Sequence, residues 1–271
     1  MADRFLDYLS LTKPRIVLLL LVTALCPMFP AAHGWPRLET LIGVIVGGAL
    51  AAGGAGSINC WFDRDIDATM RRTRRRPLPD GRIPGWHALV LGIGLNLLAA
   101  AVLVALTNLL AAGLAVLGTL IYVFVYTIWL KRSTPQNIVI GGAAGAMPPL
   151  VGWAAVTGGL DVTALSLFGI IFLWTPPHFW SLAQLIKDDY SRARVPMLPV
   201  VSGNRSARIQ SLLYAVLLTC VSVVPFATHA AGAVYLVGAL VLGVGFIVMA
   251  SVEWASWEME PKDIAPVANL L

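Results

Sequence analysis

Oxygen-bearing side chains spaced four residues apart follow one of the long apolar segments. They are Asn59, Asp63 and Asp67, and on a continuing helix they would line one face, about 6 Å apart along the axis. Two carboxylates and an amide oxygen are hard ligands of the kind that Mg²⁺ accepts, commonly while sharing the ion with substrate phosphates. The spacing therefore predicts a magnesium site. The alternative is that these acids only balance basic neighbours in a solvated loop.

A second acidic pair, Asp188 and Asp189, lies just after a later apolar segment, and a run of arginines follows the first acids. Residues 71–76 hold five arginines in six positions, and arginine makes bidentate contacts to phosphate oxygens. Such a run is also typical of an ordinary cytoplasmic loop or of a contact with anionic lipid. Taken together, the two acidic clusters and the arginines predict a polyphosphate held between the clusters through metal ions.

The composition indicates the kind of protein that must position these residues. Of 271 residues, 58% are hydrophobic and 12% are charged, whereas a soluble domain has roughly 25% charged residues. A soluble enzyme is therefore excluded, and a net charge of +5 is explained by membrane-flanking loops without any nucleic acid. The three cysteines (Cys26, Cys60 and Cys220) lie in or beside apolar segments, so we expect neither a disulfide nor a metal site from them.

Long uncharged segments predict an all-α transmembrane bundle with eight spans. They cover residues 16–36, 40–62, 83–130, 133–160, 162–186 and 209–252. A span needs about 20 apolar residues, so the third and the last segments each hold two, with a hairpin near Thr107 and Asn108 in the third. We expect one transmembrane domain over residues 1–252 and an atypical polar tail over 253–271. Lysine and arginine gather in alternate loops, which places the N-terminus and the charged loops in the cytoplasm of a bacterial inner membrane.

Five stretches resemble those of the UbiA-type intramembrane prenyltransferases and, within that superfamily, the protoheme IX farnesyltransferases. They are residues 9–16, 63–79, 130–146, 174–180 and 189–200. The resemblance implies transfer of farnesyl from farnesyl diphosphate to a vinyl group of heme B, with addition of water, to give heme O and diphosphate. Heme B is then a substrate, and Mg²⁺, with two ions expected, is the cofactor. The family normally has nine helices, so the tail is expected to be truncated relative to it.

The resemblance also implies roles for individual residues. Asp63, Asp67 and Asp189 would be catalytic through metal, and His178 would act on the acceptor. The expected metal ligands are Asn59, Asp63, Asp67, Asp188 and Asp189. The expected diphosphate contacts are Arg71, Arg72, Arg75, Lys131, Tyr126, Lys13 and Arg15.

The membrane-embedded part is expected to hold the apolar portion of the site. Pro148–Pro149 and Pro176–Pro177 lack amide donors and should break or kink their spans. Glycines 141, 142 and 145 allow close helix approach, which packing alone also explains. Trp174, Phe179 and Trp180 could shield an allylic cation or form an ordinary aromatic belt. His178 could ligate heme iron, handle a proton, or simply bond a carbonyl freed at the proline pair.

Several other functions fit parts of this pattern. A related prenyltransferase with another acceptor, such as an aromatic acid or a chlorophyllide, would differ only in substrate. A transporter would be expected to carry ionisable groups near the membrane midplane or inverted repeats. A structural subunit of a respiratory complex would have no use for the acid spacing. The expected partners are farnesyl diphosphate, heme B and membrane lipid, with hand-over of the product to heme A synthase or a terminal oxidase.

Overall fold

The computed structural model describes residues 2–258, which form helices and no strand. The π-helix η1 spans Ile121–Leu130, and all the other elements are α-helices. These are α1 (Ala2–Leu11), α2 (Pro14–Leu25), α3 (Met28–Ala31), α4 (Leu38–Phe62), α5 (Arg64–Thr69), α6 (Gly85–Leu106), α7 (Leu109–Leu120), α8 (Lys131–Ser133), α9 (Asn137–Thr157), α10 (Val162–Leu185), α11 (Lys187–Arg192), α12 (Leu198–Val201), α13 (Gly203–Val221), α14 (Val224–Ala227) and α15 (Ala233–Glu258).

Eight helical segments of the described chain are long and apolar enough to cross a membrane, which confirms the predicted bundle. Two of them are composite. The segment Leu109–Ser133 joins α7, η1 and α8, and the segment Gly203–Ala227 joins α13 and α14. The predicted hairpin between the third and fourth spans is also confirmed. There the side chain of Asn108 accepts a hydrogen bond from the Ala111 amide at 2.9 Å and so caps α7.

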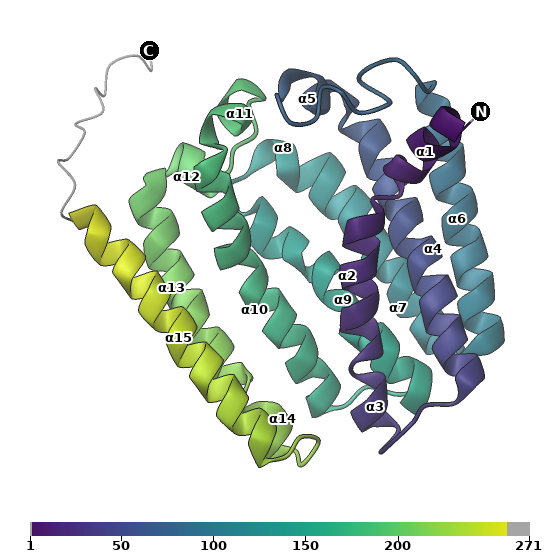
Figure 1. The fold of residues 1–271 in the computed structure, drawn as a ribbon, viewed down its shortest axis with the longest axis vertical. Coiled ribbons are helices and arrows are strands. Elements are labelled where there is room, and N and C mark those ends of the chain that lie inside the picture. Colours follow the sequence, from purple (N-terminus) through teal and green to yellow (C-terminus); the bar gives the residue numbers. More distant parts are fainter. Residues whose placement is uncertain (1, 259–271) are drawn as a thin grey trace.

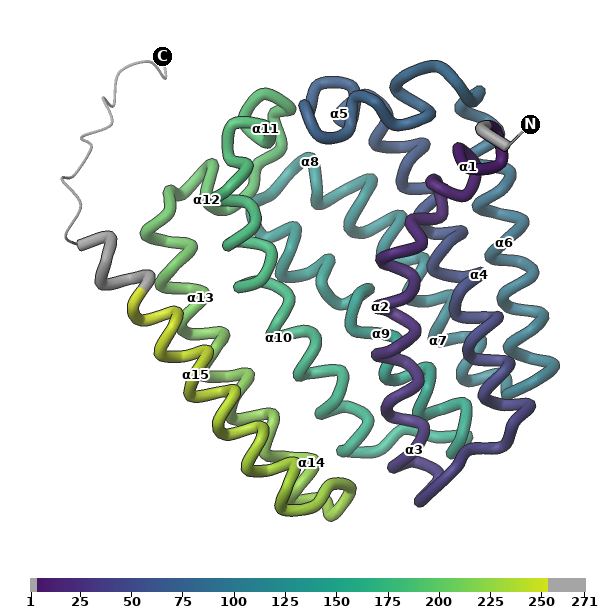
Figure 2. Tube along the Cα trace, in the orientation of Figure 1, coloured from purple at the N-terminus to yellow at the C-terminus, as the bar shows by residue number. Residues whose placement is uncertain are grey.

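The short helices lie at the two ends of the bundle (Figure 1). Helices α1, α5, α8 and α11 lie at one end, which we call the charged end, and α3 and α14 lie at the other. The spans between them are unequally placed: in Figure 2, α9 runs through the middle of the bundle and α15 along one side. In α9, 67% of the most apolar window is buried, and in α15 only 6%. Helix α9 is therefore the centre of the bundle and α15 its lipid-facing edge.

The proline pairs do not break their helices, so a break, one of the two expected effects, is wrong; a kink stays a prediction. Helix α9 continues through Pro148 and Pro149, and α10 continues through Pro176 and Pro177. Three of the four prolines are buried against neighbouring helices, and such packing keeps a turn helical even where amide donors are missing.

The C-terminal boundary also differs from the hydropathy pattern. Helix α15 continues past Val252 to Glu258. The polar tail expected over 253–271 lies, from residue 259 onwards, outside the described residues.

Candidate functional site

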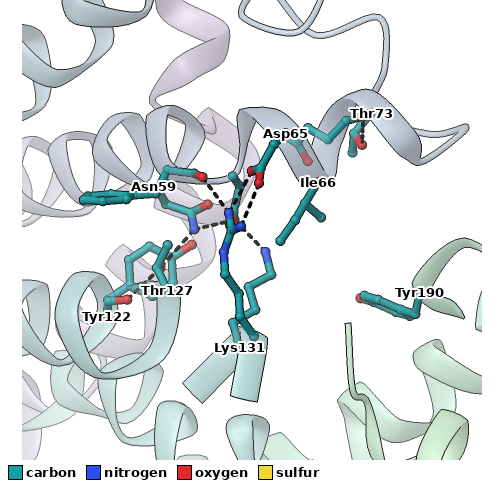
Figure 3. Close-up of polar contacts among 12 residues, drawn as sticks. Asn59, Asp65, Ile66, Thr73, Tyr122, Thr127, Lys131 and Tyr190 are labelled. Atoms are coloured by element: carbon teal, nitrogen blue, oxygen red, sulfur yellow. Dashed lines mark hydrogen bonds and ion pairs between the residues drawn. The ribbon is translucent and has the colours of Figure 1, made fainter. Parts of the chain in front are cut away.

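Asn59 is the centre of a buried polar network in the last turn of α4 (Figure 3). Its side chain is 3% exposed. The Oδ1 atom accepts a hydrogen bond from Lys13 Nζ at 2.6 Å, while Nδ2 donates to Asp63 Oδ2 at 2.7 Å and to Thr127 Oγ1 at 3.0 Å. Buried amides are costly unless their polar atoms are paired. Asn59 therefore ties the start of α2 and helix η1 to the first acidic cluster.

Asp63 lies where α4 ends and α5 begins, and it is 2% exposed. Its Oδ2 atom accepts a hydrogen bond from Lys131 Nζ at 2.5 Å. Its Oδ1 atom is buried and has no hydrogen-bond partner within the described chain. A buried carboxylate oxygen without a donor is unfavourable, so this atom is suited to accept a cation or a donor from a ligand.

Asp67 continues the four-residue spacing on α5 and is also buried. The amide of Asp63 donates to the Asn59 carbonyl at 2.9 Å, and the amide of Asp67 donates to the Asp63 carbonyl at 2.7 Å. The helical hydrogen bonds therefore persist across the junction of α4 and α5. The Asp67 carboxylate accepts a hydrogen bond from Arg76 Nη1 at 2.8 Å.

Asp65, which belongs to neither the predicted metal ligands nor the phosphate contacts, pairs with a different cation. Arg132 donates to its two carboxylate oxygens at 2.7 and 2.8 Å. This guanidinium lowers the pKa of the Asp65 carboxyl to about 2. The Asp65–Arg132 pair therefore lies on a different side of α5 from the Asp67–Arg76 pair.

The π-helix η1 brings two residue pairs spaced five apart onto common faces. A π-helix closes hydrogen bonds between residues five apart, and here the Lys131 amide donates to the Tyr126 carbonyl. Lys131 Nζ lies 6.0 Å from the centre of the Tyr126 ring. One turn earlier, Thr127 Oγ1 donates to the Tyr122 carbonyl at 2.8 Å, and the Tyr122 and Tyr126 rings stack at 5.7 Å.

Glycine 141 makes room for this arrangement. A Cβ atom at that position would lie 2.3 Å from Cδ2 of the Tyr126 ring, so only glycine lets the ring lie against α9. Gly142 approaches the Thr175 side chain in the same way, whereas a Cβ at Gly145 would meet nothing. The expected close helix approach therefore holds at the first two positions and not at the third.

The second acidic cluster divides into one engaged residue and one exposed residue. Asp189 is buried and forms an ion pair with Arg192, while Asp188 is exposed. Burial raises the pKa of the Asp189 carboxyl, but hydrogen bonds from the Arg192 guanidinium and the Arg71 backbone amide lower it below its usual value overall. Of the two expected ligands, Asp189 contacts the arginine run through the Arg71 backbone.

Helices α5 and α11, which carry the two acidic clusters, pack against each other at the charged end (Figure 1). Ile66 and Met70 share a hydrophobic cluster with Tyr190 and Val195. Arg72 donates to the Tyr190 hydroxyl at 3.2 Å and lies 5.6 Å from the centre of its ring. In Figure 3, Tyr190 lies to the right of the network, with its ring directed toward Lys131.

The remaining expected phosphate contacts are less fixed. Arg71, Arg72, Arg75 and Arg15 are exposed, whereas Lys13 is partly buried. Lys13 has a left-handed backbone with φ of 54° just before Pro14, and from there its amine reaches Asn59. Arg15 and Arg75 make no side-chain hydrogen bond or ion pair within the described chain.

His178 is surrounded by aromatic rings. Its ring stacks on Trp174 with centroids 4.3 Å apart and meets the edge of Phe179 at 5.6 Å. No hydrogen bond reaches the ring in the part of the chain that the structure describes, so a bond to a carbonyl at the proline pair does not account for it. Trp180 is fully buried against Tyr214 and belongs to another face of α10.

The next question is whether the predicted ligand residues lie close enough together to hold Mg²⁺. Among residues 2–258, no three histidine, cysteine, aspartate or glutamate side chains gather closely enough to hold one ion. The structure instead joins Asn59 and Asp63, an amide and a carboxylate 2.7 Å apart. The Asn59 atom that meets the carboxylate is the nitrogen Nδ2, and its Oδ1 oxygen accepts from Lys13. The unpartnered Asp63 Oδ1 is therefore the oxygen that fits Mg²⁺, which prefers hard oxygen ligands.

Three residues of the network were absent from the predicted site. Arg76 binds Asp67, and Thr127 accepts a hydrogen bond from Asn59. The Tyr122 hydroxyl lies 3.5 Å from Lys13 Nζ. Arg76 stands in the arginine run, so its residue type was a usable signal. Thr127 and Tyr122 lie inside an apolar segment, and nothing in their spacing connects them with Asn59.

Comparisons with known proteins show the family to which the chain belongs. The sequence profile of the UbiA prenyltransferase family matches residues 19–268. Protoheme IX farnesyltransferase of Symbiobacterium thermophilum is 55% identical over 241 residues, which cover 89% of this chain and 80% of that protein. The enzyme of the same name from Chloroflexus aurantiacus is 53% identical over 93% of this chain, but the chain spans only 43% of that protein's length.

Solved structures of low sequence identity share the fold. A UbiA homolog from Archaeoglobus fulgidus, bound to DMAPP and Mg²⁺, superposes with a TM-score of 0.76 at 18% identity, covering 96% of this chain and 91% of that one. A digeranylgeranylglyceryl phosphate synthase superposes with a TM-score of 0.77 at 20% identity, covering 94% and 91%.

Proposed function

Because the chain belongs to the UbiA prenyltransferase family and, within it, to the protoheme IX farnesyltransferases, we propose that it transfers farnesyl to heme B. The allylic C–O bond of farnesyl diphosphate breaks, and its electron pair leaves with diphosphate. The terminal vinyl carbon forms the new C–C bond. Water adds to the neighbouring carbon and loses a proton, which gives heme O.

The observation that carries this proposal is the buried acid network with an unpartnered carboxylate oxygen on Asp63. Its acidic and basic side chains lie together at the charged end, where a diphosphate would contact the cations directly and the acids through metal. A structural subunit would not need a desolvated cluster of this kind, and a transporter would be expected to carry its ionisable groups near the midplane.

The cofactor is proposed to be Mg²⁺, as in the Archaeoglobus structures bound to a prenyl diphosphate and Mg²⁺. Asn59, Asp63 and Asp67 would hold one ion, and Asp189, with Asp188 beside it, would hold a second. When bound, the metal supplies positive charge that neutralises the leaving diphosphate.

Residues of the chain itself would hold the diphosphate. Lys131 and Arg76 already neutralise Asp63 and Asp67 at 2.5 and 2.8 Å, so both cations are positioned to turn to phosphate oxygens. Arg71 and Arg72 approach from the side of α11, and bidentate arginine contacts would orient the diphosphate. Lys13 and Tyr126 define the inner side of the site, and Arg75 and Arg15 supply further positive charge at its rim.

His178 is proposed to act on the heme rather than on the diphosphate. It lies inside the spanning helix α10, about two turns before that helix ends at Leu185, and thus deeper in the bundle than the acids of α11. Its ring, stacked on Trp174 and without a hydrogen bond in the described structure, could ligate iron or handle the proton of the added water. We expect His178→Ala to lose prenyl transfer and to keep farnesyl diphosphate binding. Equal loss of both would remove this role.

The charged end is proposed to face the cytoplasm of a bacterial inner membrane, since lysine and arginine are retained on that side. Farnesyl diphosphate would then enter from the cytoplasmic side and heme B from the membrane. The product would pass to heme A synthase or to a terminal oxidase.

One assay tests the reaction. Purified protein in lipid nanodiscs is given farnesyl diphosphate, heme B and Mg²⁺, and the product is identified by mass spectrometry. We expect a farnesylated, hydrated heme that disappears when EDTA replaces Mg²⁺. Farnesylation of an aromatic acid or a chlorophyllide, with none of heme, would support a different acceptor. No prenyl transfer to any acceptor would refute the enzyme itself.

A further inference from the structure

A basic groove of about 380 Å³ lies at the charged end beside the acid network, and the proposed reaction gives it no role. Its lining includes Asp65 and Thr69 on α5, Arg132 on α8, and Arg192 and Arg194 around the end of α11. A separate hollow is lined by residues that include Lys13, Asp67 and Arg76. Helix α5 therefore contributes to two recesses, one with Asp67 and one with Asp65.

The three arginines of this groove are held in different ways. Arg132 is fixed by the Asp65 carboxylate and by the Phe62 carbonyl, to which it donates at 2.8 Å. Arg192 is fixed by Asp189. The Arg194 side chain is exposed and has neither a hydrogen bond nor an ion pair among the described residues, so its guanidinium is available to an external partner.

The backbone at Arg194 is unusual for its residue type. Its φ is 53°, in the left-handed region that glycine and asparagine adopt more readily. The turn is held by hydrogen bonds from the Arg194 amide to the Ser191 carbonyl and from the Val195 amide to the Tyr190 carbonyl, both at 3.0 Å. The next residue, Val195, is 1% exposed. Strained positions of this kind often occur at functional sites.

We propose that this groove binds the two propionate carboxylates of heme B, with Arg194 as their main contact. The inference rests on the proposed function and adds the subsite that recognises the acceptor. Three guanidiniums line the groove; Arg132 is paired with Asp65 and Arg192 with Asp189, which leaves Arg194 as the one without a carboxylate among the described residues. Arginine is also the side chain best suited to bidentate contact with a carboxylate.

The position of the groove favours the acceptor over the diphosphate. Lys131 and Arg132 are adjacent in sequence, yet Lys131 contacts Asp63 and Arg132 contacts Asp65. The two substrates would thus bind on neighbouring flanks of α5. The propionates of a heme are at one edge of the ring, so anchoring them at the charged end would direct the opposite, vinyl-bearing part of the ring into the bundle.

The test compares heme B with its dimethyl ester, in which both carboxylates are blocked. Binding of each is titrated by Soret absorbance to protein in phosphatidylcholine nanodiscs. Charge-assisted hydrogen bonds of this kind change affinity by about tenfold or more. We expect wild type to prefer heme B over the ester by at least about tenfold, and Arg194→Gly to lose that preference while binding the ester and farnesyl diphosphate as before.

Matched variants and lipids make the result decisive. Glycine accepts the left-handed backbone at residue 194, so Arg194→Gly keeps the turn, and Arg194→Lys should lose part of the preference. Arg4→Ala removes an equal charge from the exposed helix α1 and should change nothing. Equal binding of heme B and its ester by wild type would overturn the proposal and leave heme farnesylation, measured separately, standing.

Two further outcomes also contradict the proposal. If Arg194→Gly reduces phosphatidylglycerol bound in mixed nanodiscs while the preference for heme B persists, the groove is a site for lipid head groups. If wild type neither binds nor farnesylates heme, the acceptor of the proposed reaction is wrong and the propionate site falls with it.

Discussion

The two acidic clusters of the charged end are built in different ways. Asp63 and Asp67 are buried and are neutralised by Lys131 and Arg76, which come from segments 68 and 9 residues away. Asp189 is paired with Arg192 only three residues along the same short helix, and its neighbour Asp188 is exposed. The Asp63–Lys131 pair is thus a product of helix packing, whereas the Asp189–Arg192 pair forms within one short helix. Removing charge should therefore disturb the first cluster far more than the second.

The largest effect is expected from breaking the buried pair of Asp63 and Lys131. Lys131→Met leaves an uncompensated buried carboxylate, and loss of one partner of such a pair costs about 3–5 kcal/mol. Thermal unfolding of purified protein in detergent should show a large loss of stability. The double variant with Asp63→Asn should recover most of that stability and remain inactive. A double variant no more stable than Lys131→Met would contradict the assignment of this pair.

Loss of turnover should follow from Asp63→Asn alone. The substitution keeps the shape of the side chain and removes the charge, and losing one electrostatic contributor of this kind lowers kcat by about 10²- to 10³-fold. The rate of heme O formation is normalised to folded protein. Asp80→Asn is the matched control, because it removes the same charge from an exposed position at the same end of the bundle, where Asp80 pairs with Arg82, and it should retain most activity. Similar losses in both variants would show that net charge alone matters.

Within the second cluster, Asp189 and Asp188 form a natural comparison. Asp189→Asn should lower turnover about 10- to 100-fold, less than Asp63→Asn, because Asp189 pairs with a more exposed cation than Asp63 does. Asp188→Asn should stay within about twofold of wild type. The dependence of the rate on Mg²⁺ concentration should shift for the first variant only. A larger effect at Asp188 would mean that the exposed acid is the ligand.

The smallest effect concerns the pH dependence of the Asp65–Arg132 pair. Because the pKa of Asp65 is lowered to about 2 in the folded protein, the pair stabilises the fold above the unfolded pKa of about 4. That contribution is lost as the pH falls from about 4 towards 2. The pair is exposed, so it should contribute less than about 1 kcal/mol. Melting temperatures measured across this range should fall slightly less for Asp65→Asn than for wild type.

Much of the architecture was predictable because its causes are local. The eight spans follow from the length of uncharged segments, and the hairpin at Asn108 follows from a residue that caps a helix with its own side chain. The register of Asn59, Asp63 and Asp67 follows from hydrogen bonds between residues four apart. The continuity of α9 and α10 through their proline pairs was not predictable in this way, because packing against neighbouring helices outweighed the missing donors.

The amino-acid sequence by itself determined that this protein is a membrane helix bundle with two acidic clusters and an arginine run on one side. The tertiary structure alone decided which charges meet. Tyr126 and Lys131 would be roughly 140° apart around an α-helix, and the π-helix η1 brings them onto one face. Lys13 reaches Asn59 across 46 residues, and the Arg71 backbone reaches Asp189. Such contacts depend on how distant helices pack, and no local spacing records that.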